Sequence, residues 1–519
     1  MKSAAKHRSN LRDTEHKPIL VSAGMRLTDL LAGTETLKVS GPSEGEITSL
    51  AYYSQKVCSG AMFFALPGAK ADGNAFVPDA IERGAVAIAS EMPAPAELPG
   101  NVTWVQVRNS RRALATVAAN FYRRPADSLE LIAVTGTNGK TTITYLVDSI
   151  LCAAGRVTGL LGTISYRTPK GMRKAPNTTP ESLDFQEILA ELRAAGGTHA
   201  VLEASSHALV MDRLWGCRFA AAIFTNLTRD HLDYHKTFEN YFAAKRILFE
   251  GTGAGAPAVG IVNTDDSYGR QLVGLARQTL TYGLKNGAQL TTRKFDLSFS
   301  GLQFTAHTPK GNIEVQSPLV GRINVYNILA AIGAGLALGI GRQAIEAGIR
   351  QLESVPGRFQ RIDEGQPFLV VVDYAHTDDA LRNLITTARE LNPNGKIIIL
   401  FGAGGDRDRT KRPLMGEATG SLADLVVLSS DNPRSEDPLR IINDVVVGLQ
   451  KVNAKYHIEP DRERAIDLAL DAAKPGDMVL LAGKGHENYQ ITRDRTFEFD
   501  DREMARRALR RRGYTKAAQ

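Results

Sequence analysis

Residues 136–142 read GTNGKTT and place a lysine and two threonines beside glycines, between two apolar segments. The run 131–136 predicts a strand that ends at this loop, and the spacing of apolar residues from Ile143 to Leu151 predicts a helix that ends at Gly155. Loop N–H groups, the helix N-terminus and the lysine together bind phosphate, and a threonine hydroxyl can bind Mg²⁺. We therefore expect this loop to bind ATP through Gly136, Thr137, Asn138, Gly139, Lys140, Thr141 and Thr142.

Carboxylate and imidazole side chains follow two further apolar segments. Glu203 lies near the end of the predicted strand 199–205, and residues 224–249, which follow the predicted strand 220–226, are dense in His, Asp and Asn. Ligands of open parallel sheets bind at the carboxyl ends of the strands, and Mg²⁺ prefers oxygen ligands. We expect Glu203 to bind Mg²⁺ near the phosphates, although a glutamate at a strand end is also often an ordinary surface group.

The tetrapeptide DNPR, residues 431–434, follows another predicted strand. Asn-Pro favours an extended turn, which would present Arg434 to a ligand. A guanidinium binds a carboxylate through two parallel hydrogen bonds, which a lysine cannot do. The tetrapeptide therefore indicates a site for a ligand with a carboxylate, with a simple turn as the alternative.

These segments must be positioned by a larger α/β framework. A chain of 519 residues with 43% apolar and 23% charged residues predicts a globular protein of two to four domains. Strands and helices alternate from residue 131, which predicts a central parallel-sheet ATPase domain with the phosphate loop, and a second series after residue 353 predicts a C-terminal Rossmann-like domain. Residues before 110 predict a small α/β module. We expect a disordered extension at 1–20, the small module at 21–110, the central domain at 111–352 and the C-terminal domain at 353–519. The expected strands of the two later domains are 131–136, 199–205, 220–226, 258–263, 368–376, 396–405, 425–434 and 478–487.

Charge and cysteine content limit the partners and the compartment. The net charge of +7 is small for this length, and the basic run 506–516 predicts a solvated terminal helix, with a polyanion-binding tail as the alternative. Three isolated cysteines indicate neither disulfides nor a zinc site. The N-terminus lacks the apolar core of a signal peptide, and the apolar run Ile328–Ile340 is too short to span a bilayer and predicts a buried helix. We expect a cytoplasmic protein that binds no membrane.

The segments TGTNGKTT, EASSHALVMDR, TNLTRDHLDYH and AAKRILF, in this order, resemble the Mur ligases, which build the peptidoglycan precursor by ATP-driven amide formation. Val134 stands where the general phosphate-loop pattern has its first glycine, and this form of the loop is shared by the Mur ligases and the folylpolyglutamate synthases. The resemblance implies that Lys245 is carbamylated and that two Mg²⁺ ions are bound. It assigns catalysis to Lys140, Glu203, His231 and Lys245, and metal binding to Thr141, Glu203, His231 and carbamylated Lys245.

The resemblance extends to the substrates, and it is closest to the family members that add meso-diaminopimelate. It implies further ATP contacts at Asn263, Arg358, Asp373 and His376. For UDP-MurNAc-L-Ala-D-Glu it implies Ser54, Lys70, Ala71, Asn177, Thr178, Thr179, Ser205, Met211 and Arg213. For meso-diaminopimelate it implies Arg407, Asp431, Asn432, Pro433, Arg434, Gly483 and Glu487.

The expected activity is therefore ATP-dependent addition of meso-diaminopimelate to the D-Glu γ-carboxylate through an acyl phosphate, by a monomer that binds no nucleic acid. Two other classes remain open. A folate-linked glutamate ligase would share the loop. A nucleic-acid-dependent NTPase would account for the loop and the basic charge but leaves DNPR and residues 177–182 unexplained. A binding protein without catalysis is disfavoured by the four catalytic residue types.

Overall fold

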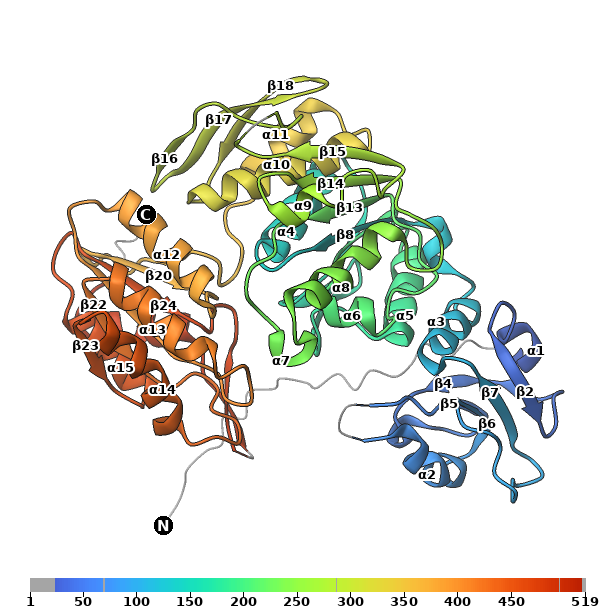
Figure 1. The fold of residues 1–519 in the computed structure, drawn as a ribbon. Coiled ribbons are helices and arrows are strands. Elements are labelled where there is room, and N and C mark those ends of the chain that lie inside the picture. Colours follow the sequence, from blue (N-terminus) through green and yellow to red (C-terminus); the bar gives the residue numbers. More distant parts are fainter. Residues whose placement is uncertain (1–23, 69–70, 286, 494, 516–519) are drawn as a thin grey trace, which may run out of the picture. The chain divides into compact units, whose positions relative to one another are not determined.

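The computed structural model describes residues 24–68, 71–285, 287–493 and 495–515. The predicted disordered extension 1–20 and the expected substrate contact Lys70 lie outside these residues. The chain divides into two compact units, Met1–Arg124 and Pro125–Gln519, and each is described by itself (Figure 1). In the described ranges, no helix combines the length and the apolar character that a membrane span requires.

The first unit is built on a five-stranded sheet with the order β2-β7-β6-β5-β4. Strands β4 to β7 are parallel, and β2 is antiparallel to β7. Phe63, Ile88 and Trp104 of the sheet share one apolar core, as predicted for a small α/β module. The elements are β1 Met25–Arg26, α1 Leu27–Leu30, β2 Thr36–Ser40, β3 Glu46–Ile47, β4 Ser49–Ala51, β5 Ala61–Phe64, α2 Val77–Glu82, β6 Ala85–Ser90, β7 Thr103–Val107 and α3 Ser110–Phe121.

The second unit begins with an eight-stranded sheet in the order β11-β10-β9-β12-β8-β13-β14-β15. The six strands from β9 to β15 in this order are parallel, and β10 and β11 are antiparallel additions at one edge. The predicted parallel sheet is confirmed. The strands are β8 Glu130–Thr135, β9 Thr158–Leu161, β10 Ser165–Thr168, β11 Gly171–Lys174, β12 His199–Glu203, β13 Ala221–Phe224, β14 Val259–Asn263 and β15 Gln278–Tyr282.

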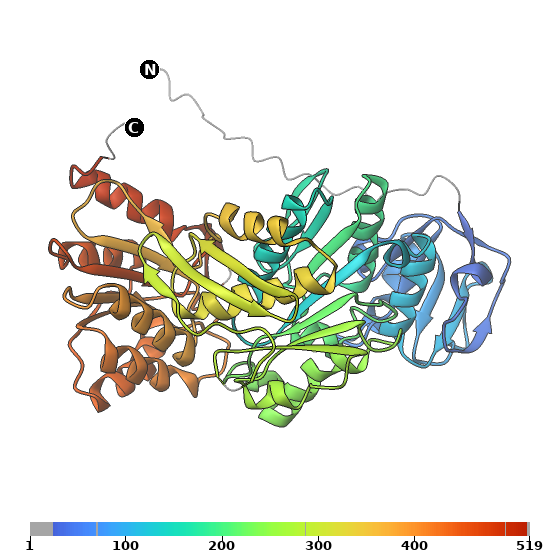
Figure 2. The ribbon, with the colours of Figure 1, turned by 90° about the horizontal axis from the view of Figure 1, so that it is seen from above.

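Helices cover both faces of this sheet, which explains why its strands are apolar throughout rather than alternating. In β8, Ile132 and Val134 face one core and Leu131 and Ala133 face the other. The first core includes α4 Lys140–Ala153, α10 Arg322–Ala337 and α11 Arg342–Gln351, and the second includes α5 Ser182–Ala194, α6 Ser206–Val210 and α8 Phe238–Glu250. The predicted buried helix at Ile328 is thus confirmed as part of α10. The antiparallel strands β16 Asp296–Ser298, β17 Gly301–Thr308 and β18 Gly311–Ser317 form a separate sheet, and β18 packs on α11 (Figure 2).

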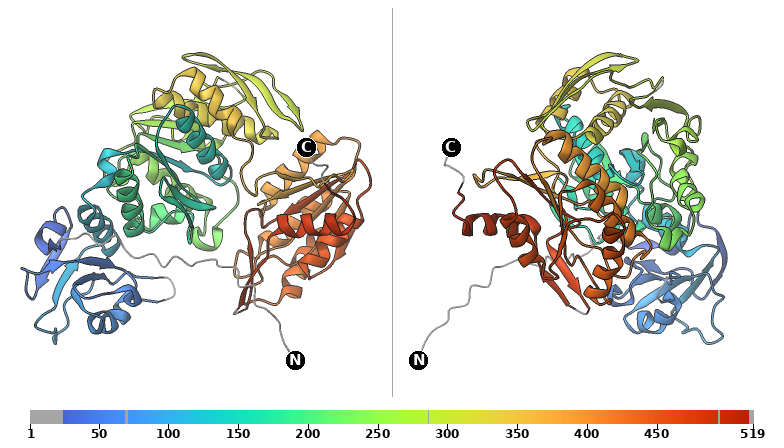
Figure 3. Two further views of the ribbon diagram at one scale, coloured as in Figure 1. Left: turned by 180° about the vertical axis from the view of Figure 1, so that it is seen from behind. Right: turned by 60° about the vertical axis from the view of Figure 1, so that its left-hand side comes forward.

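The C-terminal part has a six-stranded sheet in the order β19-β20-β24-β21-β22-β23, parallel except for β19. Helices α12, α13 and α14 share a core with one face of the sheet, and α15 and α16 share a core with the other (Figure 3). This is the predicted Rossmann-like arrangement. The elements are β19 Gln360–Ile362, β20 Leu369–Asp373, α12 Asp378–Leu391, β21 Ile397–Phe401, α13 Lys411–Leu422, β22 Leu425–Leu428, α14 Pro438–Lys451, β23 Tyr456–Ile458, α15 Arg462–Asp471, β24 Met478–Ala482, β25 Tyr489–Thr492, β26 Arg495–Glu498 and α16 Asp501–Arg511.

The basic run near the C-terminus lies largely in α16, a helix that buries Ala505, Ala508 and Leu509. Its arginines pair with acidic side chains of this same part of the chain. Arg510 pairs with Glu364 at 2.9 Å, and Arg512 pairs with Asp467 at 2.8 Å. The predicted terminal helix is therefore confirmed, and these ion pairs partly neutralise its positive charge.

A buried ion pair fixes α16 to the sheet. Arg462 and Asp501 are both fully buried, and Arg462 Nη2 lies 2.7 Å from Asp501 Oδ2. The same guanidinium donates to the carbonyl oxygens of Ser430 at 3.2 Å and Ala482 at 2.9 Å, which follow β22 and end β24. Arg462 therefore holds the ends of two neighbouring strands.

Replacing Asp501 with Ala should lower the free energy of unfolding by about 3–5 kcal/mol, because it leaves a buried guanidinium without its counter-charge. Chemical denaturation followed by circular dichroism measures the change. The control is Glu250→Ala, which removes the exposed partner of Arg246 in α8 and should cost less than about 1 kcal/mol. Equal losses for the two variants would contradict the prediction.

Candidate active site

The loop between β8 and α4 adopts a conformation that requires two glycines. Gly136 has φ 140° and Gly139 has φ 89°, and a side chain at Gly139 would come within 2.6 Å of Asn327 Oδ1. Lys140 Nζ donates to the carbonyl oxygens of Gly136 at 3.0 Å and Thr137 at 2.8 Å. Burial lowers the pKa of Lys140, against the attraction of neighbouring carboxylates. The loop thus holds its lysine at the N-terminus of α4, where an anion is favoured.

Glu203 lies beside this loop because β12 runs parallel to β8, with Glu203 opposite Val134. The side chain is 1% exposed. Its Oε1 accepts from Thr141 Oγ1 at 3.0 Å and from the Thr163 N–H at 2.9 Å, and its Oε2 accepts from Thr163 Oγ1 at 3.0 Å. In the described part of the chain, hydroxyl and amide groups are its hydrogen-bond donors, and no lysine or arginine pairs with it. A buried carboxylate with this environment is suited to a hard cation.

Lys245 projects from α8 toward the same loop and is 1% exposed. Its Nζ donates to the Gly136 carbonyl oxygen at 2.7 Å and lies 4.4 Å from the centre of the Tyr241 ring. Burial, and next the charge of Lys140, lower the pKa of Lys245 well below its ordinary value, while Asp230 opposes the shift. The amine is therefore shifted toward its neutral, nucleophilic form.

His231 precedes α7 Leu232–His235 and has a left-handed backbone with φ 54°. Its Nε2 lies 3.4 Å from Asp230 Oδ2, and its ring lies edge-on to His207 with a centroid separation of 5.0 Å. Burial lowers the pKa of His231 to about 3, with Asp230 opposing, so the ring is neutral and able to bind a cation. Within the described ranges, no group of three or more His, Cys, Asp or Glu side chains forms a metal cluster, and the expected metal set stays a prediction.

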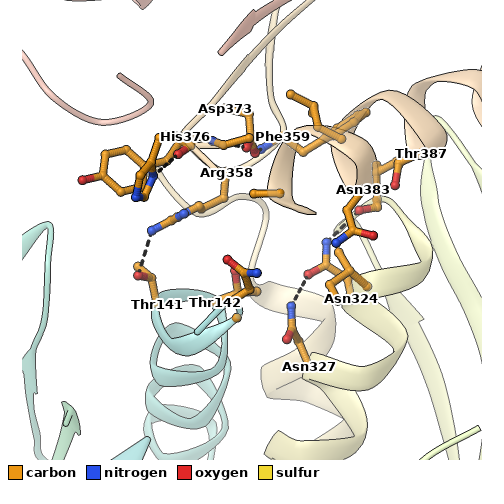
Figure 4. A pocket seen from close by; sticks show the side chains of 18 residues that line it. Thr141, Thr142, Asn324, Asn327, Arg358, Phe359, Asp373, His376, Asn383 and Thr387 are labelled. Atoms are coloured by element: carbon orange, nitrogen blue, oxygen red, sulfur yellow. Dashed lines mark hydrogen bonds between the residues drawn. The ribbon is translucent and has the colours of Figure 1, made fainter. Parts of the chain in front are cut away.

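A cavity of about 120 Å³ opens between the phosphate loop and the C-terminal part of the second unit (Figure 4). Arg358 connects the two sides, because its Nη2 donates to Thr141 Oγ1 at 3.1 Å. Asp373 accepts from the backbone N–H groups of Phe359 at 2.7 Å and Ala375 at 2.8 Å, and burial raises its pKa. The structure thus brings together several of the expected ATP contacts: Asn138, Gly139, Thr141, Thr142, Arg358, Asp373 and His376.

Two asparagines of α10 also line this cavity, and the sequence analysis missed them (Figure 4). Asn327 Nδ2 donates to Asn324 Oδ1 at 2.8 Å, and Asn324 Nδ2 donates to the Val320 carbonyl oxygen at 2.7 Å. Both residues are largely buried in a helix that is mostly apolar. Two amides three residues apart in an apolar helix could have indicated this cavity from the sequence, because buried polar side chains require hydrogen-bond partners.

Asn263 lies in a neighbouring cavity of about 250 Å³ rather than in the first one. Its Nδ2 donates to the Thr225 carbonyl oxygen at 2.8 Å. Asp265 lines the same neighbouring cavity and accepts from the Tyr326 hydroxyl at 2.9 Å. Asn138 and Asn327 line both cavities, so the two lie on either side of the phosphate loop and α10.

A third cavity, of about 270 Å³, joins the ends of the central and C-terminal sheets. Thr178 and His231 line it from the central part, and Tyr374 and His376 are shared with the first cavity. Six of the seven residues expected to bind diaminopimelate line it, and Pro433 is not among the lining residues: Arg407, Asp431, Asn432, Arg434, Gly483 and Glu487. Asp230, Asp233, Asp408 and Lys411 line it as well and were not in the expected set.

Arg434 faces this cavity with a left-handed backbone at φ 52°. Its Nη1 donates to the Gly405 carbonyl oxygen at 2.7 Å, which fixes the guanidinium. Asn432 Nδ2 donates to Glu487 Oε2 at 2.9 Å, and burial, then Asp431, raise the pKa of Glu487. The cavity therefore carries a fixed guanidinium beside two carboxyl groups, which matches a ligand with one carboxylate and one ammonium at the same end.

The stretch 177–182 contacts Glu203 directly. Thr179 Oγ1 donates to the Glu203 carbonyl oxygen at 2.7 Å and accepts from the Ser205 N–H at 3.1 Å. Arg213 Nη1 donates to the Thr179 carbonyl oxygen at 2.9 Å and its Nη2 contacts Met211 Sδ at 3.7 Å. In addition, Thr178 Oγ1 lies 3.2 Å from Thr163 Oγ1, and the Asn177 carbonyl oxygen accepts from Tyr166. The expected substrate residues of the second unit are thus one connected cluster beside Glu203.

The expected residues of the first unit are described separately. Ser54 begins a short 3₁₀ turn, is 7% exposed, and hydrogen-bonds Asp79. Ala71 is exposed. Their role in binding uridine diphosphate stays a prediction.

Fold and site together define an α/β protein with a glycine-rich phosphate-type loop at one cavity and a second cavity lined by charged side chains beside it. Three family profiles match the chain: the Mur ligase family catalytic domain over residues 46–122, the Mur ligase middle domain over residues 134–335, and the Mur ligase glutamate ligase domain over residues 357–485. The chain belongs to the Mur ligase family.

Relatives that match nearly the whole chain support this family assignment. A protein of Solibacter usitatus named UDP-N-acetylmuramoyl-L-alanyl-D-glutamate--2,6-diaminopimelate ligase is 52% identical over 493 residues, which cover 94% of this chain and 99% of that protein. A protein of the same name from Geobacter metallireducens is 43% identical, covering 94% of this chain and 98% of that protein.

Solved structures agree on the fold. One of a ligase with the same name has a TM-score of 0.66 at 34% identity and covers 95% of this chain and 100% of that chain. A folylpolyglutamate synthase of Mycobacterium tuberculosis, solved with ADP and AMPPCP, has a TM-score of 0.58 at 17% identity, with 72% of this chain and 92% of that chain covered. This second likeness concerns the fold alone and does not favour a folate substrate.

Replacing Asn327 with Ala should weaken ATP binding about tenfold, because it removes an amide from the wall of the first cavity and a hydrogen-bonded neighbour of Asn324. Isothermal titration calorimetry with a non-hydrolysable ATP analogue measures the affinity. Gln303→Ala on β17, an exposed amide outside the three cavities, is the control and should leave the affinity unchanged. Unchanged affinity for Asn327→Ala would remove Asn327 from the nucleotide site.

Proposed function

We propose that this chain is an ATP-dependent ligase that joins meso-2,6-diaminopimelate to the D-Glu γ-carboxylate of UDP-MurNAc-L-Ala-D-Glu, in peptidoglycan precursor synthesis in the cytoplasm. The observation that carries the proposal is the shared wall of two cavities. Tyr374 and His376 line both the cavity at the phosphate loop and the cavity that holds Arg434. An activated carboxylate and an incoming amine can therefore meet at that wall. The reaction requires neither nucleic acid nor a second copy of the chain.

The residues beside the loop fit Mg²⁺. Thr141 and Glu203 supply hydroxyl and carboxylate oxygens, and His231 supplies a neutral imidazole. We propose that these residues, together with modified Lys245, hold two ions. When bound, Mg²⁺ would offset the negative charge of the phosphates and of the attacking carboxylate.

The environment of Lys245 supports carbamylation. Its amine is buried, its pKa is depressed, and it lies beside a second lysine, so the neutral form can attack CO₂. A nitrogen–carbon bond forms and one proton is released. The product is an anion with two oxygens, which replaces a group that repels cations with one that can bind them.

The chemistry assigned to the chain's own residues is positioning and charge stabilisation. The substrate carboxylate approaches the γ-phosphate, and Lys140 offsets the repulsion between these two anions. Thr178, Thr179 and Arg213 hold the substrate beside Glu203, and the first unit contributes Ser54 and Ala71 to the uridine diphosphate. Arg407 and Arg434 bind the distal carboxylate of diaminopimelate, and Asp431 and Glu487 bind its distal ammonium, which leaves the other amine free to react.

A panel of amino acids tests the proposal directly. With ATP and UDP-MurNAc-L-Ala-D-Glu, phosphate release should be fastest with meso-diaminopimelate and at least about tenfold slower with L-lysine, which has no second carboxylate for Arg434 to bind. In the same assay, Arg434→Lys should lower kcat/KM for diaminopimelate about 10- to 100-fold and leave KM for ATP within about twofold, because it removes a two-point hydrogen bond.

The control variant for the panel is Arg440→Lys on α14, an exposed arginine outside the cavity. It should behave as the unmodified protein does. Equal rates with lysine and diaminopimelate, or equal losses of ATP and diaminopimelate use in Arg434→Lys, would mean that the amino-acid site is misassigned.

Lys245→Ala should reduce turnover about 100- to 1,000-fold, and acetate or formate should restore part of it by returning an anion to the vacated space. Phosphate release with and without added carboxylate measures both effects. Arg246→Ala, one residue further along α8 and 44% exposed, serves as the control. Normal activity of Lys245→Ala without a rescue agent would refute the carbamate role.

A further inference from the structure

Lys411 is the first residue of α13 and is 9% exposed. It lines the 270 Å³ cavity together with Asp230, His376 and the residues assigned to diaminopimelate. The role of Lys411 proposed below rests on the function proposed above, but neither the sequence motifs nor that function used this residue.

The ammonium of Lys411 differs from those of the other buried lysines. Lys140 and Lys245 donate to the Gly136 carbonyl oxygen, and Lys484 lies 3.3 Å from Glu487 Oε2. Across the described residues, by contrast, no hydrogen bond or ion pair holds Lys411. The Lys411 side chain is thus largely buried, and its ammonium has no protein partner among the described residues at the cavity wall, a position that favours an anionic ligand inside the cavity.

Contacts at the start of α13 show which end of the cavity Lys411 serves. Arg229, which precedes Asp230 in the chain, donates from Nη2 to Thr410 Oγ1 at 2.7 Å and lies 3.9 Å from Asp408 Oδ2. The residue next to Thr410, Lys411, therefore lies beside the segment of Asp230 and His231, and all three line the same cavity. The charges that act on Arg434, in contrast, come chiefly from Arg407, Asp431 and Glu487. Lys411 therefore faces the phosphate end of the cavity, away from the distal carboxylate of the amino acid.

We propose that Lys411 is a further catalytic residue whose ammonium contacts the oxygens of the phosphoryl group that passes from ATP to the substrate carboxylate. In the first step the carboxylate oxygen bonds to the γ-phosphorus while the bond from that phosphorus to the bridging oxygen breaks, and ADP leaves with the electron pair. In the second step the amine nitrogen bonds to the acyl carbon, the carbon–oxygen bond to phosphate breaks, and phosphate leaves with the electron pair. The proton released by the amine passes to phosphate or solvent. Lys411 stabilises the phosphoryl oxygens in both steps.

The test separates the first step from the second. A single turnover with ATP and UDP-MurNAc-L-Ala-D-Glu, without diaminopimelate, reports ADP formed with the acyl phosphate. Lys411→Met should slow this ADP formation at least about 100-fold, while KM for ATP and for diaminopimelate in the full reaction stays within about threefold. Lys411→Arg keeps the charge and should recover most of the rate, within about tenfold of the unmodified protein.

The matched control is Lys451→Met on α14, a lysine that is 67% exposed, and it should leave every rate unchanged. Thermal unfolding of all variants checks the fold. Lys411→Arg keeps the test decisive if Lys411→Met unfolds: an Arg variant with normal stability but ADP formation at least about 100-fold slower than in the unmodified protein would overturn the proposal.

Two further outcomes would also overturn it. ADP formation at the normal rate in Lys411→Met, with only the diaminopimelate-dependent step slowed, would move the residue to the amine end. A normal rate in both steps would remove it from the chemistry. If the unmodified protein forms neither ADP nor product with these substrates, the proposed function fails and the role of Lys411 fails with it. That result differs from an active unmodified protein whose Lys411→Met variant has normal rates, which would overturn the role of Lys411 alone.

Discussion

The carbonyl oxygen of Gly136 accepts hydrogen bonds from two lysines, Lys140 at 3.0 Å and Lys245 at 2.7 Å. Two buried amines on one acceptor repel each other when both are charged, and this repulsion adds to burial in lowering the pKa of Lys245. The arrangement also requires glycine at position 136, because its φ of 140° favours glycine and a side chain there would collide with Thr225. This contact ties β8, α4 and α8 together, and the chemistry assigned to the loop depends on it.

Parallel strand register explains why much of the site could be predicted from the sequence. The strands β8, β12 and β13 are neighbours, and their carboxyl ends meet at one edge, so motifs 60 or more residues apart converge there. Lys140 comes after one apolar strand and Glu203 ends another. The pattern of strands and helices therefore predicts both at the same edge of the sheet. The two sheets and their helix layers were predictable for the same reason, because buried parallel strands leave long apolar runs.

Other residues could not be found this way, because their place depends on tertiary packing between elements that no local sequence pattern encodes. Lys411 begins a helix and carries no motif, and its place in the cavity follows from the packing of α13 beside α12. Arg462 is similar: nothing local to α15 indicates that its guanidinium reaches the ends of β22 and β24. Pro433 belongs to the DNPR motif but is not among the residues that line the cavity, and its assignment stays a prediction.

The wall between the two cavities gives the site a physical basis for communication between its ligands. Arg358 lies 4.7 Å from the centre of the Tyr374 ring and also donates to Thr141 at the phosphate loop. On its other side, Tyr374 lies in the cavity of Arg434 and contacts Glu487 through its hydroxyl at 3.5 Å. A nucleotide bound against Arg358 and an amino acid bound against Tyr374 would therefore meet two side chains that contact each other. Any coupling between the two binding sites through this contact would be reciprocal, so that each ligand would change the affinity for the other by the same factor. Arg358 and Tyr374 thus form the physical connection between the cavity at the phosphate loop and the cavity of Arg434.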